Sequence, residues 1–453
     1  MKKLIIAAFS AVLMTACVKV DFNETINQGG GGGTNPGDTI PAVLTGRIDR
    51  NLTLPKGKYR LRGFVYVGNG ATLTFAPGCV VLAVTSEKSA LIIEQGGKLV
   101  ADGVPNDPIV FTSDKPKGQR REFDWGGISI CGLAPTNRPL VPAPITEGGS
   151  NRPYGGTAAG DNSGILRYVR VEFAGVTAEN NSELNGITFY GVGAGTIVEN
   201  VMTSYCGDDG FEFFGGTVNC KNLISFASGD DDFDFDFGYN GQIQFAVSLR
   251  DKYSDDDDAN QIECDNDASG TAATPFTRPV LSNFTLIGPA DTSGIGTNGS
   301  RHRFGNRWRR NTRFEIRNSV IIGQRDFAFY VENDPTIDAF VLGESVARNN
   351  ILGSFRQPTY GSSNNARLPV DSMMRVLTRT GNSFIANRDS AYLTSAFNLN
   401  NPNFLPAANS PALTGANYTG LSAFFATGTF RGAFGTVNWT APWANWNPQN
   451  TDY

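Results

Sequence analysis

The chain has 453 residues, of which 40% are hydrophobic, 18% are charged and 53 are glycine. Many glycines and few charges favour a β-rich domain with tight turns over a helical one. The formal net charge of −5 gives no general attraction for phosphate, so nucleic acid is not an expected partner.

Residues 1–16 predict a signal peptide. Two lysines precede an apolar run, residues 4–14, which is too short to cross a bilayer. Small residues before Cys17 resemble a bacterial lipobox, in which Cys17 is acylated, for example with palmitate, and becomes the mature N-terminus. The alternative is an ordinary signal peptide beside an unrelated cysteine. The lipobox predicts a membrane anchor at the bacterial outer membrane, on its periplasmic or cell-surface side.

Residues 17–41 predict a flexible tether, because they contain five consecutive glycines, residues 29–33. A lipid-anchored domain needs such a spacer to stand away from a membrane. The remainder, residues 42–453, is expected to fold as a single domain and to be monomeric.

Cysteine and histidine usage excludes a zinc site. Five cysteines follow Cys17 without any CxxC pair, and the chain has one histidine, His302, which is expected to be exposed. The odd count and scattered spacing argue against a disulfide framework, so these cysteines are expected to be buried apolar residues.

Short β-type runs punctuated by glycine and asparagine follow from residue 42 onward, with almost no helical periodicity. Examples are 71–84, 90–103, 109–114, 165–176 and 279–288. Such spacing predicts a sandwich, a barrel or a β-solenoid. Residues 134–160 are rich in proline and glycine and predict a long excursion that forms one wall of a groove.

An internal repeat favours the solenoid. Residues 200–217 align with 222–239 at an offset of 22, and looser Asn-apolar-Gly copies occur at 283–288, 318–323 and 349–353. A 22-residue repeat of strands is about one turn of a parallel β-helix. Residues one period apart then lie above one another at about 4.8 Å. The expected inward ladders are Phe211 over Phe233 and Phe213 over Phe235.

Carboxylates alternate with the phenylalanines of this repeat. With a side-chain period of two, the rings point into the coil and the acids point out. This predicts an outward column of acids on successive coils, a parallel second column, and two stacked aspartate pairs before the strands. The first column is Glu212, Asp234 and Glu263, the second is Asp236 and Asp265, and the pairs are Asp208-Asp209 and Asp230-Asp231.

Stacked carboxylates repel one another and need relief by raised pKa values, a cation or arginines. Ca²⁺ accepts several carboxylates in a flexible geometry, so the acids just named are candidate calcium ligands. Seven arginines lie in residues 301–317. We expect Arg303 beside Glu263 on the next coil. Alternatively, all these acids are turn and ladder residues neutralised by arginine and calcium.

Coil and cap patterns recur in residues 73–81, 93–103, 108–113, 124–132, 409–416 and 430–435. These segments resemble the pectate-lyase-like superfamily of right-handed parallel β-helices. They are also similar to a group of uncharacterised Gram-negative surface lipoproteins. The resemblance implies an all-β solenoid with an N-terminal cap and a tryptophan-rich C-terminal cap around Trp439, Trp443 and Trp446.

Two functions follow as hypotheses. The first is a non-catalytic surface protein that binds a glycan or a partner, with Ca²⁺ stabilising the acidic face. The second, implied by resemblance to pectate lyases and polygalacturonases, is a polysaccharide lyase or glycoside hydrolase acting on an acidic polysaccharide. Its catalytic candidates are Glu212, Asp234 and Arg303, the last as base, although the Gly-His-Gly of polygalacturonases is absent. Candidate ligand-binding residues are Arg301, Arg307 and Trp308.

Overall fold

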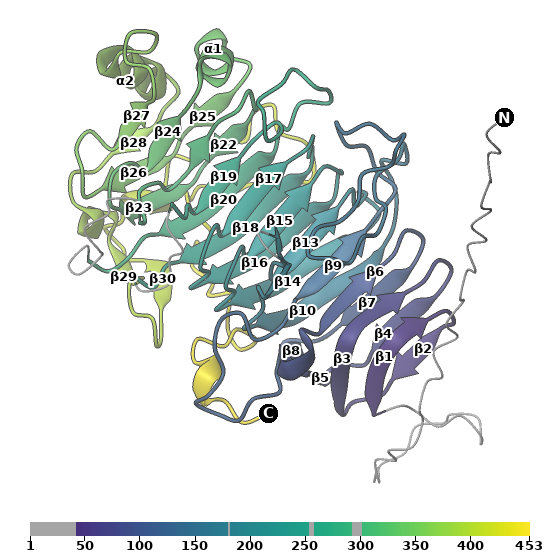
Figure 1. Cartoon of the computed structure of the whole chain (residues 1–453). Coiled ribbons are helices and arrows are strands. Elements are labelled where there is room, and N and C mark those ends of the chain that lie inside the picture. Colours follow the sequence, from purple (N-terminus) through teal and green to yellow (C-terminus); the bar gives the residue numbers. More distant parts are fainter. Residues whose placement is uncertain (1–41, 180–181, 253–257, 292–300) are drawn as a thin grey trace, which may run out of the picture.

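The computed structural model describes residues 42–453 except 180–181, 253–257 and 292–300. Stacked coils of short strands run from the N-terminal end to the far end of the molecule (Figure 1). One sheet of 26 strands winds through all of them. The strands of neighbouring coils pair in parallel, for example β14 with β16 and β15 with β17. The predicted parallel β-helix is therefore confirmed.

Each coil contributes to three ladders of strands, and the first ladder begins at β2. Several long strands bend in the middle, so that their first half belongs to this ladder and their second half to the next. The first ladder comprises β2 (Leu52–Leu54), β4 (Thr72–Phe75), β7 (Lys98–Asp102), the first halves of β10 (Gly164–Glu172), β14 (Ile197–Ser204), β16 (Asn219–Phe226), β18 (Gln242–Leu249) and β20 (Val280–Ile287), and then β22 (Glu315–Arg317) and β25 (Val346–Arg348).

The second ladder continues from the bends. It comprises the first halves of β1 (Val43–Ile48) and β3 (Lys58–Val67), then β5 (Val80–Ala83), β8 (Ile109–Ser113), the second halves of β10, β14, β16, β18 and β20, and finally β23 (Val320–Gln324), β26 (Ile351–Ser354) and β28 (Ser383–Phe384).

The third ladder carries the repeated phenylalanine and acid motif. It comprises the second halves of β1 and β3, then β6 (Ala90–Ile93), β9 (Ile128–Cys131), β13 (Ile187–Tyr190), β15 (Phe211–Phe214), β17 (Phe233–Asp236), β19 (Ile262–Cys264), β21 (Arg307–Trp308), β24 (Phe329–Val331) and β27 (Tyr360–Ser362).

Asparagine occupies the corner between the first and second ladders in five of the coils. Asn200, Asn222, Asn283, Asn318 and Asn349 all adopt positive φ, between 51° and 62°. Asparagine tolerates this left-handed conformation better than other residues with a side chain except aspartate. The recurring Asn-apolar-Gly copies are therefore copies of one corner of the coil.

The coil length agrees with the repeat only where no loop is inserted. Leu223 pairs with Val201, 22 residues earlier, as the offset predicts. Arg307 pairs with Glu263, 44 residues earlier, because long segments leave the coil before β21. Inserted loops change the chain length of a coil while the strands keep their spacing.

Aromatic rings fill the interior as the repeat predicts. Phe211 stacks on Phe233 with ring centroids 5.5 Å apart, and Phe213 stacks on Phe235 at 5.1 Å. All four rings are fully buried. Cys79, Cys131, Cys206, Cys220 and Cys264 are buried free thiols, as expected.

The far end of the core is covered by helix α2 (Val370–Arg379). Met373 and Leu377 of α2 are buried in the main core, as is Phe340 of α1 (Asp334–Leu342). This differs from the expected tryptophan-rich cap. Trp443 and Trp446 instead pack against Tyr168 and Phe226, on the outer face of the second ladder.

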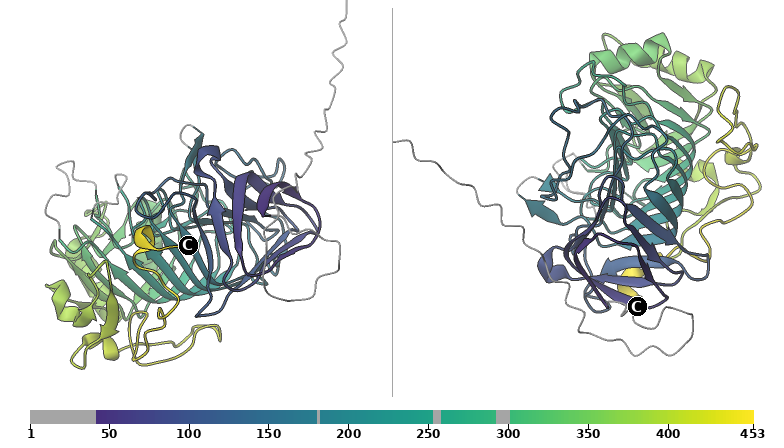
Figure 2. Two further views of the ribbon diagram at one scale, coloured as in Figure 1. Left: turned by 90° about the horizontal axis from the view of Figure 1, so that it is seen from below. Right: turned by 90° about the vertical axis from the view of Figure 1, so that its right-hand side faces the viewer.

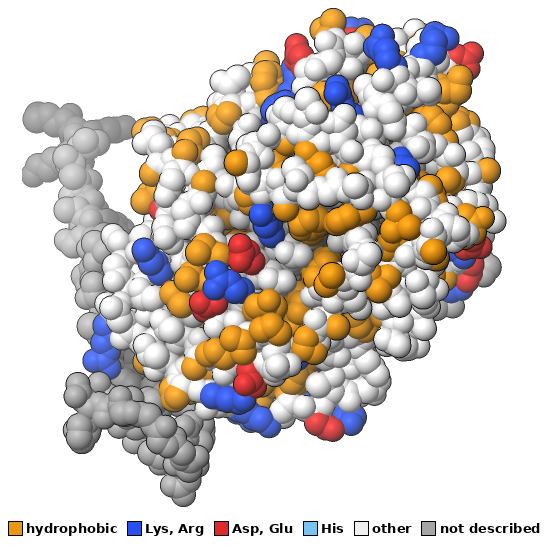
Figure 3. Space-filling view, turned by 180° about the vertical axis from the view of Figure 1, so that it is seen from behind, with side chains coloured by type: hydrophobic (Ala, Val, Ile, Leu, Met, Phe, Trp, Pro, Cys, Tyr) orange, Lys and Arg blue, Asp and Glu red, His pale blue; other side chains and the backbone are white. Residues whose placement is uncertain are grey.

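The C-terminal segment, residues 385–453, runs back along one side of the stack (Figure 2). It contains the antiparallel pair β29 (Leu393–Ser395) and β30 (Asn403–Pro406). A second small pair, β11 (Thr177–Glu179) and β12 (Ser182–Glu183), lies outside the coils. Seen from behind, the molecule carries scattered charges of both signs between hydrophobic side chains (Figure 3). Within the described residues, no helix is long and apolar enough to cross a membrane.

Candidate cation site on the third ladder

The predicted column of acids exists on the outer side of the third ladder. Glu212 pairs in register with Asp234, and Asp234 pairs with Glu263. The column starts from Thr188 on β13 and continues to Arg307 on β21. Each position lies one coil from the next, so like charges are held about 5 Å apart until the arginine.

A ladder of hydrogen bonds holds the turn that precedes these strands. The side-chain oxygen of Asn185 accepts the backbone N–H of Asp209 at 3.1 Å. That of Asp209 accepts the N–H of Asp231 at 2.8 Å, and that of Asp231 accepts the N–H of Asn260 at 2.5 Å. Asp209 and Asp231 therefore each use one carboxylate oxygen to hold the backbone of the next coil.

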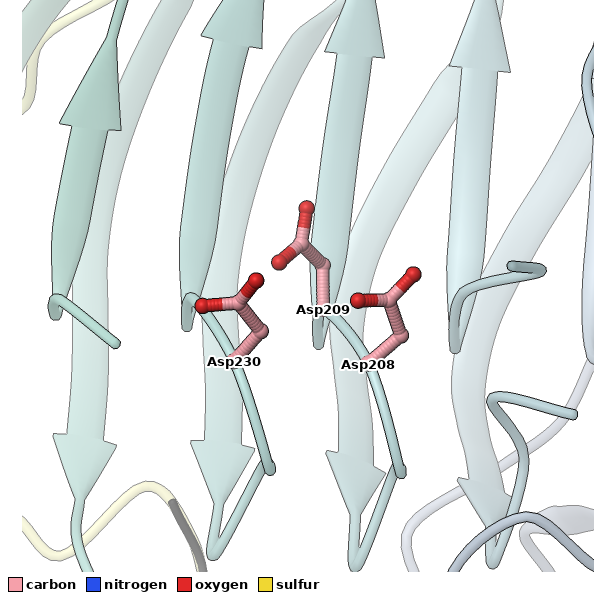
Figure 4. A group of neighbouring side chains, drawn as sticks. All are labelled: Asp208, Asp209 and Asp230. Carbon is pink, nitrogen blue, oxygen red and sulfur yellow. The ribbon is translucent and has the colours of Figure 1, made fainter. Parts of the chain in front are cut away.

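Two overlapping triads bring carboxylate oxygens together. One oxygen each of Asp208, Asp209 and Asp230 lie within 4.8 Å of one another, and so do oxygens of Asp209, Glu212 and Asp234. In the first triad the three carboxylates stand at the entrance to β15 and β17 (Figure 4). Asp209 belongs to both triads. This spacing suits one cation bridging several oxygens.

Burial raises the pKa of the acids in this cluster. For Asp209 the next causes are the charges of Asp208 and Asp231, and for Asp234 they are those of Glu263 and Asp236. The pKa values of Glu212, Asp231 and Asp236 are also raised, first by burial. The cluster therefore favours a proton or a cation over bare negative charge.

Hydrogen bonds satisfy only part of the cluster. The Nδ2 group of Asn185 donates to Glu212. The Oδ1 atom of Asp234 is buried without a hydrogen-bond partner in the described structure. A buried carboxylate oxygen without a donor costs free energy, and a cation at this point would remove that cost. The donor set, all hard oxygens, fits Ca²⁺.

Arginines neutralise the other end of the column. Arg309 contacts Glu263 and also binds Asp265 at 2.9 Å, while Arg310 binds Asp265 at 2.6 Å. The described residues show no arginine ion pair for Asp209, Glu212 or Asp234. Among the described residues, the acidic face therefore contains Glu263 and Asp265, which have arginine ion pairs, and Asp209, Glu212 and Asp234, for which no arginine ion pair is seen.

The structure corrects the expected arginine register. Arg303 does not lie beside Glu263, because Arg307 occupies that position. Arg303 instead binds Asp326 at 3.0 Å and lies 3.9 Å from Asp258. The insertion before β19 and the longer one before β21 shift the register, so a continuation counted from Phe304 misplaces the base.

Two further site predictions also change. Trp308 is fully buried and stacks on Phe314 at 4.2 Å, so it offers no face to a ligand. Its place on β21 alternates with Arg307, which points outward. His302 is buried rather than exposed, and burial lowers its pKa to about 3, so the ring is neutral. Arg301 is half-buried.

Sequence reasoning missed the two asparagines that frame the cluster. Asn185 and Asn260 occupy the same ladder as the aspartates, one coil before and one coil after. Asn260 also donates to Glu263 at 2.8 Å. Inserted loops separate both asparagines from the repeat, so their equivalence to Asp209 and Asp231 could not be seen by counting residues. The available signal was that each asparagine precedes a β-type run with an acidic or polar outward residue.

The residue 134–160 excursion reaches the acidic face from one side. The backbone N–H of Asn137 donates to Phe237 at 2.9 Å, and its side chain donates to the carbonyl of Asn266 at 2.6 Å. Burial raises the pKa of Glu212, and the negative charge of Glu147, which lies in this excursion, raises it further. The predicted loop therefore lies against the candidate site.

A family model described as a pectate-lyase-like beta helix domain matches residues 46–390. The chain belongs to this family. A search of curated proteins finds no match. Among solved structures, the catalytic domain of a GH87 alpha-1,3-glucanase variant in complex with tetrasaccharides is similar at 10% identity with a TM-score of 0.30. The similarity covers 70% of this chain and 64% of that chain, which is less than two thirds of its length.

Proposed function

We propose that this β-helix protein binds a glycan or a protein partner at the bacterial cell surface, and that Ca²⁺ held by the acidic cluster stabilises it. The observation that carries the calcium proposal is the triad of Asp209, Glu212 and Asp234, whose carboxylate oxygens lie within 4.8 Å of one another and, within the part of the chain that the structure describes, form no ion pair with an arginine. The same residues would be costly to bury if the cluster stayed empty and charged.

Calcium fits this cluster better than a transition metal. The ligands are carboxylates without cysteine or histidine, and Ca²⁺ prefers such oxygens. Bound there, the ion would supply positive charge between coils that otherwise repel one another. Asp209, Glu212 and Asp234 would hold it, with Asp208 and Asp230 on the adjoining triad.

The proposal places the protein on a lipid anchor. Cys17 and the tether of residues 17–41 lie outside the described residues, so this part rests on the lipobox pattern and the glycine run. Replacement of Cys17 by Ala is expected to abolish incorporation of labelled palmitate and to release the protein from the membrane fraction. Retention of the label in the variant would contradict the anchor.

A lyase or hydrolase is the second candidate. Its motivation is the pair of adjacent carboxylates, Glu212 and Asp234. Two observations favour binding over cleavage: Glu212 is only 6% exposed, and the proposed base Arg303 is turned toward Asp326. A cleaving enzyme needs an acid and a base within reach of one bond.

A saccharide panel with and without calcium separates these functions. The panel contains neutral oligosaccharides and oligogalacturonates, and both binding and product formation are followed, with EDTA as the calcium-free arm. We expect saturable binding of at least one saccharide without new reducing ends or unsaturated products. Cleavage would establish the second candidate. Silence in binding across the panel would leave only a protein partner, which is captured by cross-linking on intact cells.

A further inference from the structure

The outward residues of the second ladder differ in polarity and burial between the first coils and the later ones. In the first coils its outward residues include Lys58 and Arg60, which are exposed. On β10 they are Arg170 and Glu172. From β14 onward nearly every outward residue is apolar and buried. These residues are Met202, Ile224, Phe226, Val247, Leu249, Ile287, Val320, Ile322 and Ile351.

The C-terminal segment covers the apolar part of this face. Phe404, Phe434 and Trp443 are buried in the same cluster as the outward residues of six successive strands, β14, β16, β18, β20, β23 and β26. Trp446 packs on Phe226 with ring centroids 5.2 Å apart. The segment therefore touches many coils at once, whereas each coil of a solenoid otherwise touches only its neighbours.

The corner asparagines hold this segment in place. Asn318 donates to the carbonyl of Asn417 at 3.3 Å and accepts its N–H at 2.8 Å. Asn283 donates to the carbonyls of Phe430 and Gly432 at 3.2 and 3.1 Å. Both asparagine side chains are fully buried. The left-handed conformation of Asn283 and Asn318 thus directs their side-chain amides outward, where they form hydrogen bonds with the backbone of the C-terminal segment.

The last residues of the chain contact β10 and the loop after β8. The hydroxyl of Tyr453 lies 2.6 Å from both oxygens of Glu172, and the guanidinium of Arg120 lies 4.7 Å from the centre of its ring. Arg120 also donates to the carbonyl of Thr451 at 2.9 Å. Glu172 is 1% exposed. The charged outward residues of β10 therefore bind the C-terminal residues of the chain.

We propose that residues 385–453 form a strap that makes the coils from β10 to β26 open as one unit, while β1–β8 open separately. Opening any strapped coil requires release of a segment that is also bonded to the others. Among the described residues, the apolar cluster that the strap forms on this face contains no residue of β1–β8. The strap also covers the second ladder from β14 to β26, so a ligand cannot bind to that part of the ladder while the strap is in place.

Native-state hydrogen exchange of the full chain tests the strap. In the wild type, amides of the strapped strands should share one opening free energy, and those of β3–β8 should exchange sooner. The variant Asn318→Gly keeps the left-handed corner but removes the bonds to Asn417. Asn222→Gly is its matched control, because Asn222 has the same backbone conformation, with φ of 58°.

We expect Asn318→Gly to speed exchange roughly 10-fold or more in all strapped strands together, since the two hydrogen bonds to Asn417 are lost, and with them the buried one that Asn318 donates to Ser282 at 3.1 Å. The control should change only residues near its own corner. Faster exchange confined to the strap and β22–β23, or equal effects of the two variants, would overturn the proposal. So would a common opening of β3–β8 and the strapped coils in the wild type.

A second pair of variants covers failure of Asn318→Gly to fold. A Cβ added at Gly432 would lie 2.8 Å from the Thr285 hydroxyl and 3.0 Å from Val320, whereas one added at Gly420 meets nothing within 4 Å. Both glycines have φ of 84°. The backbone strain is therefore matched, and only Gly432→Ala should loosen the strapped coils together.

Discussion

Replacing Asp234 by Asn measures the repulsion in the acidic cluster. Asp234 faces Glu212 on one side and Glu263 on the other. Two carboxylates about 5 Å apart repel by roughly 3 kcal/mol at an effective dielectric constant of about 20. The charges that most raise the pKa of Asp234 are those of Glu263 and Asp236, and Arg309 offsets part of this effect. The variant should therefore recover about 2–3 kcal/mol of folding free energy at a pH where Asp234 and these neighbours would otherwise be charged.

The sign of the pH dependence follows from the raised pKa of Asp234, which is caused first by burial. An unfolded aspartate has a pKa of about 3.9, so above that pH the folded state binds more protons than the unfolded state. Without calcium, the wild type should lose stability as pH rises from about 4 through the folded pKa. The Asn variant should lose less.

Urea unfolding at pH 5 and pH 8, with EDTA or with calcium, is the assay. In EDTA at pH 8 the variant should be more stable than the wild type, and in calcium it should be less stable, because a ligand is missing. Asp326→Asn is the control, since that carboxylate is paired with Arg303 at 3.0 Å and should show no calcium dependence. A variant that is less stable than the wild type in EDTA at pH 8 would show that Asp234 does not repel its neighbours in the folded protein.

Three further outcomes are expected. Phe213→Ala should lower the free energy of unfolding by about 3–5 kcal/mol in urea titrations, because a ring stacked on both sides is removed from the core. Arg250→Met should cost about 3–5 kcal/mol by leaving Asp232 buried without its ion pair, and the added change Asp232→Asn should recover part of that loss. The five buried thiols should resist a thiol reagent in the native protein and react in denaturant; burial raises the pKa of Cys79 to about 11.

The sequence predicted most of the architecture because one coil repeats without an insertion. The offset between Phe211 and Phe233 revealed the coil length, and the alternation of rings and acids revealed which side faces the core. Both follow from local periodicity, which does not require knowledge of the rest of the chain. The column of Glu212, Asp234 and Glu263 was found in the same way.

Register beyond the repeat could not be counted from the sequence. Inserted segments of unequal length precede β19 and β21, and they placed Arg307 rather than Arg303 opposite Glu263. Likewise, Trp443 carries no local sign that it packs on Tyr168, far earlier in the chain. Its contact depends on the path of a whole segment. The apolar outward residues of β14–β23 were the available signal that something covers them.

Diffraction from crystals of calcium-loaded protein, with anomalous scattering to identify the ion, shows whether the acidic cluster binds calcium. We expect a calcium ion about 2.3–2.6 Å from carboxylate oxygens of Asp209, Glu212 and Asp234. Crystals at the same pH with calcium that show these carboxylates bonded only to one another, with no ion between them, would contradict it.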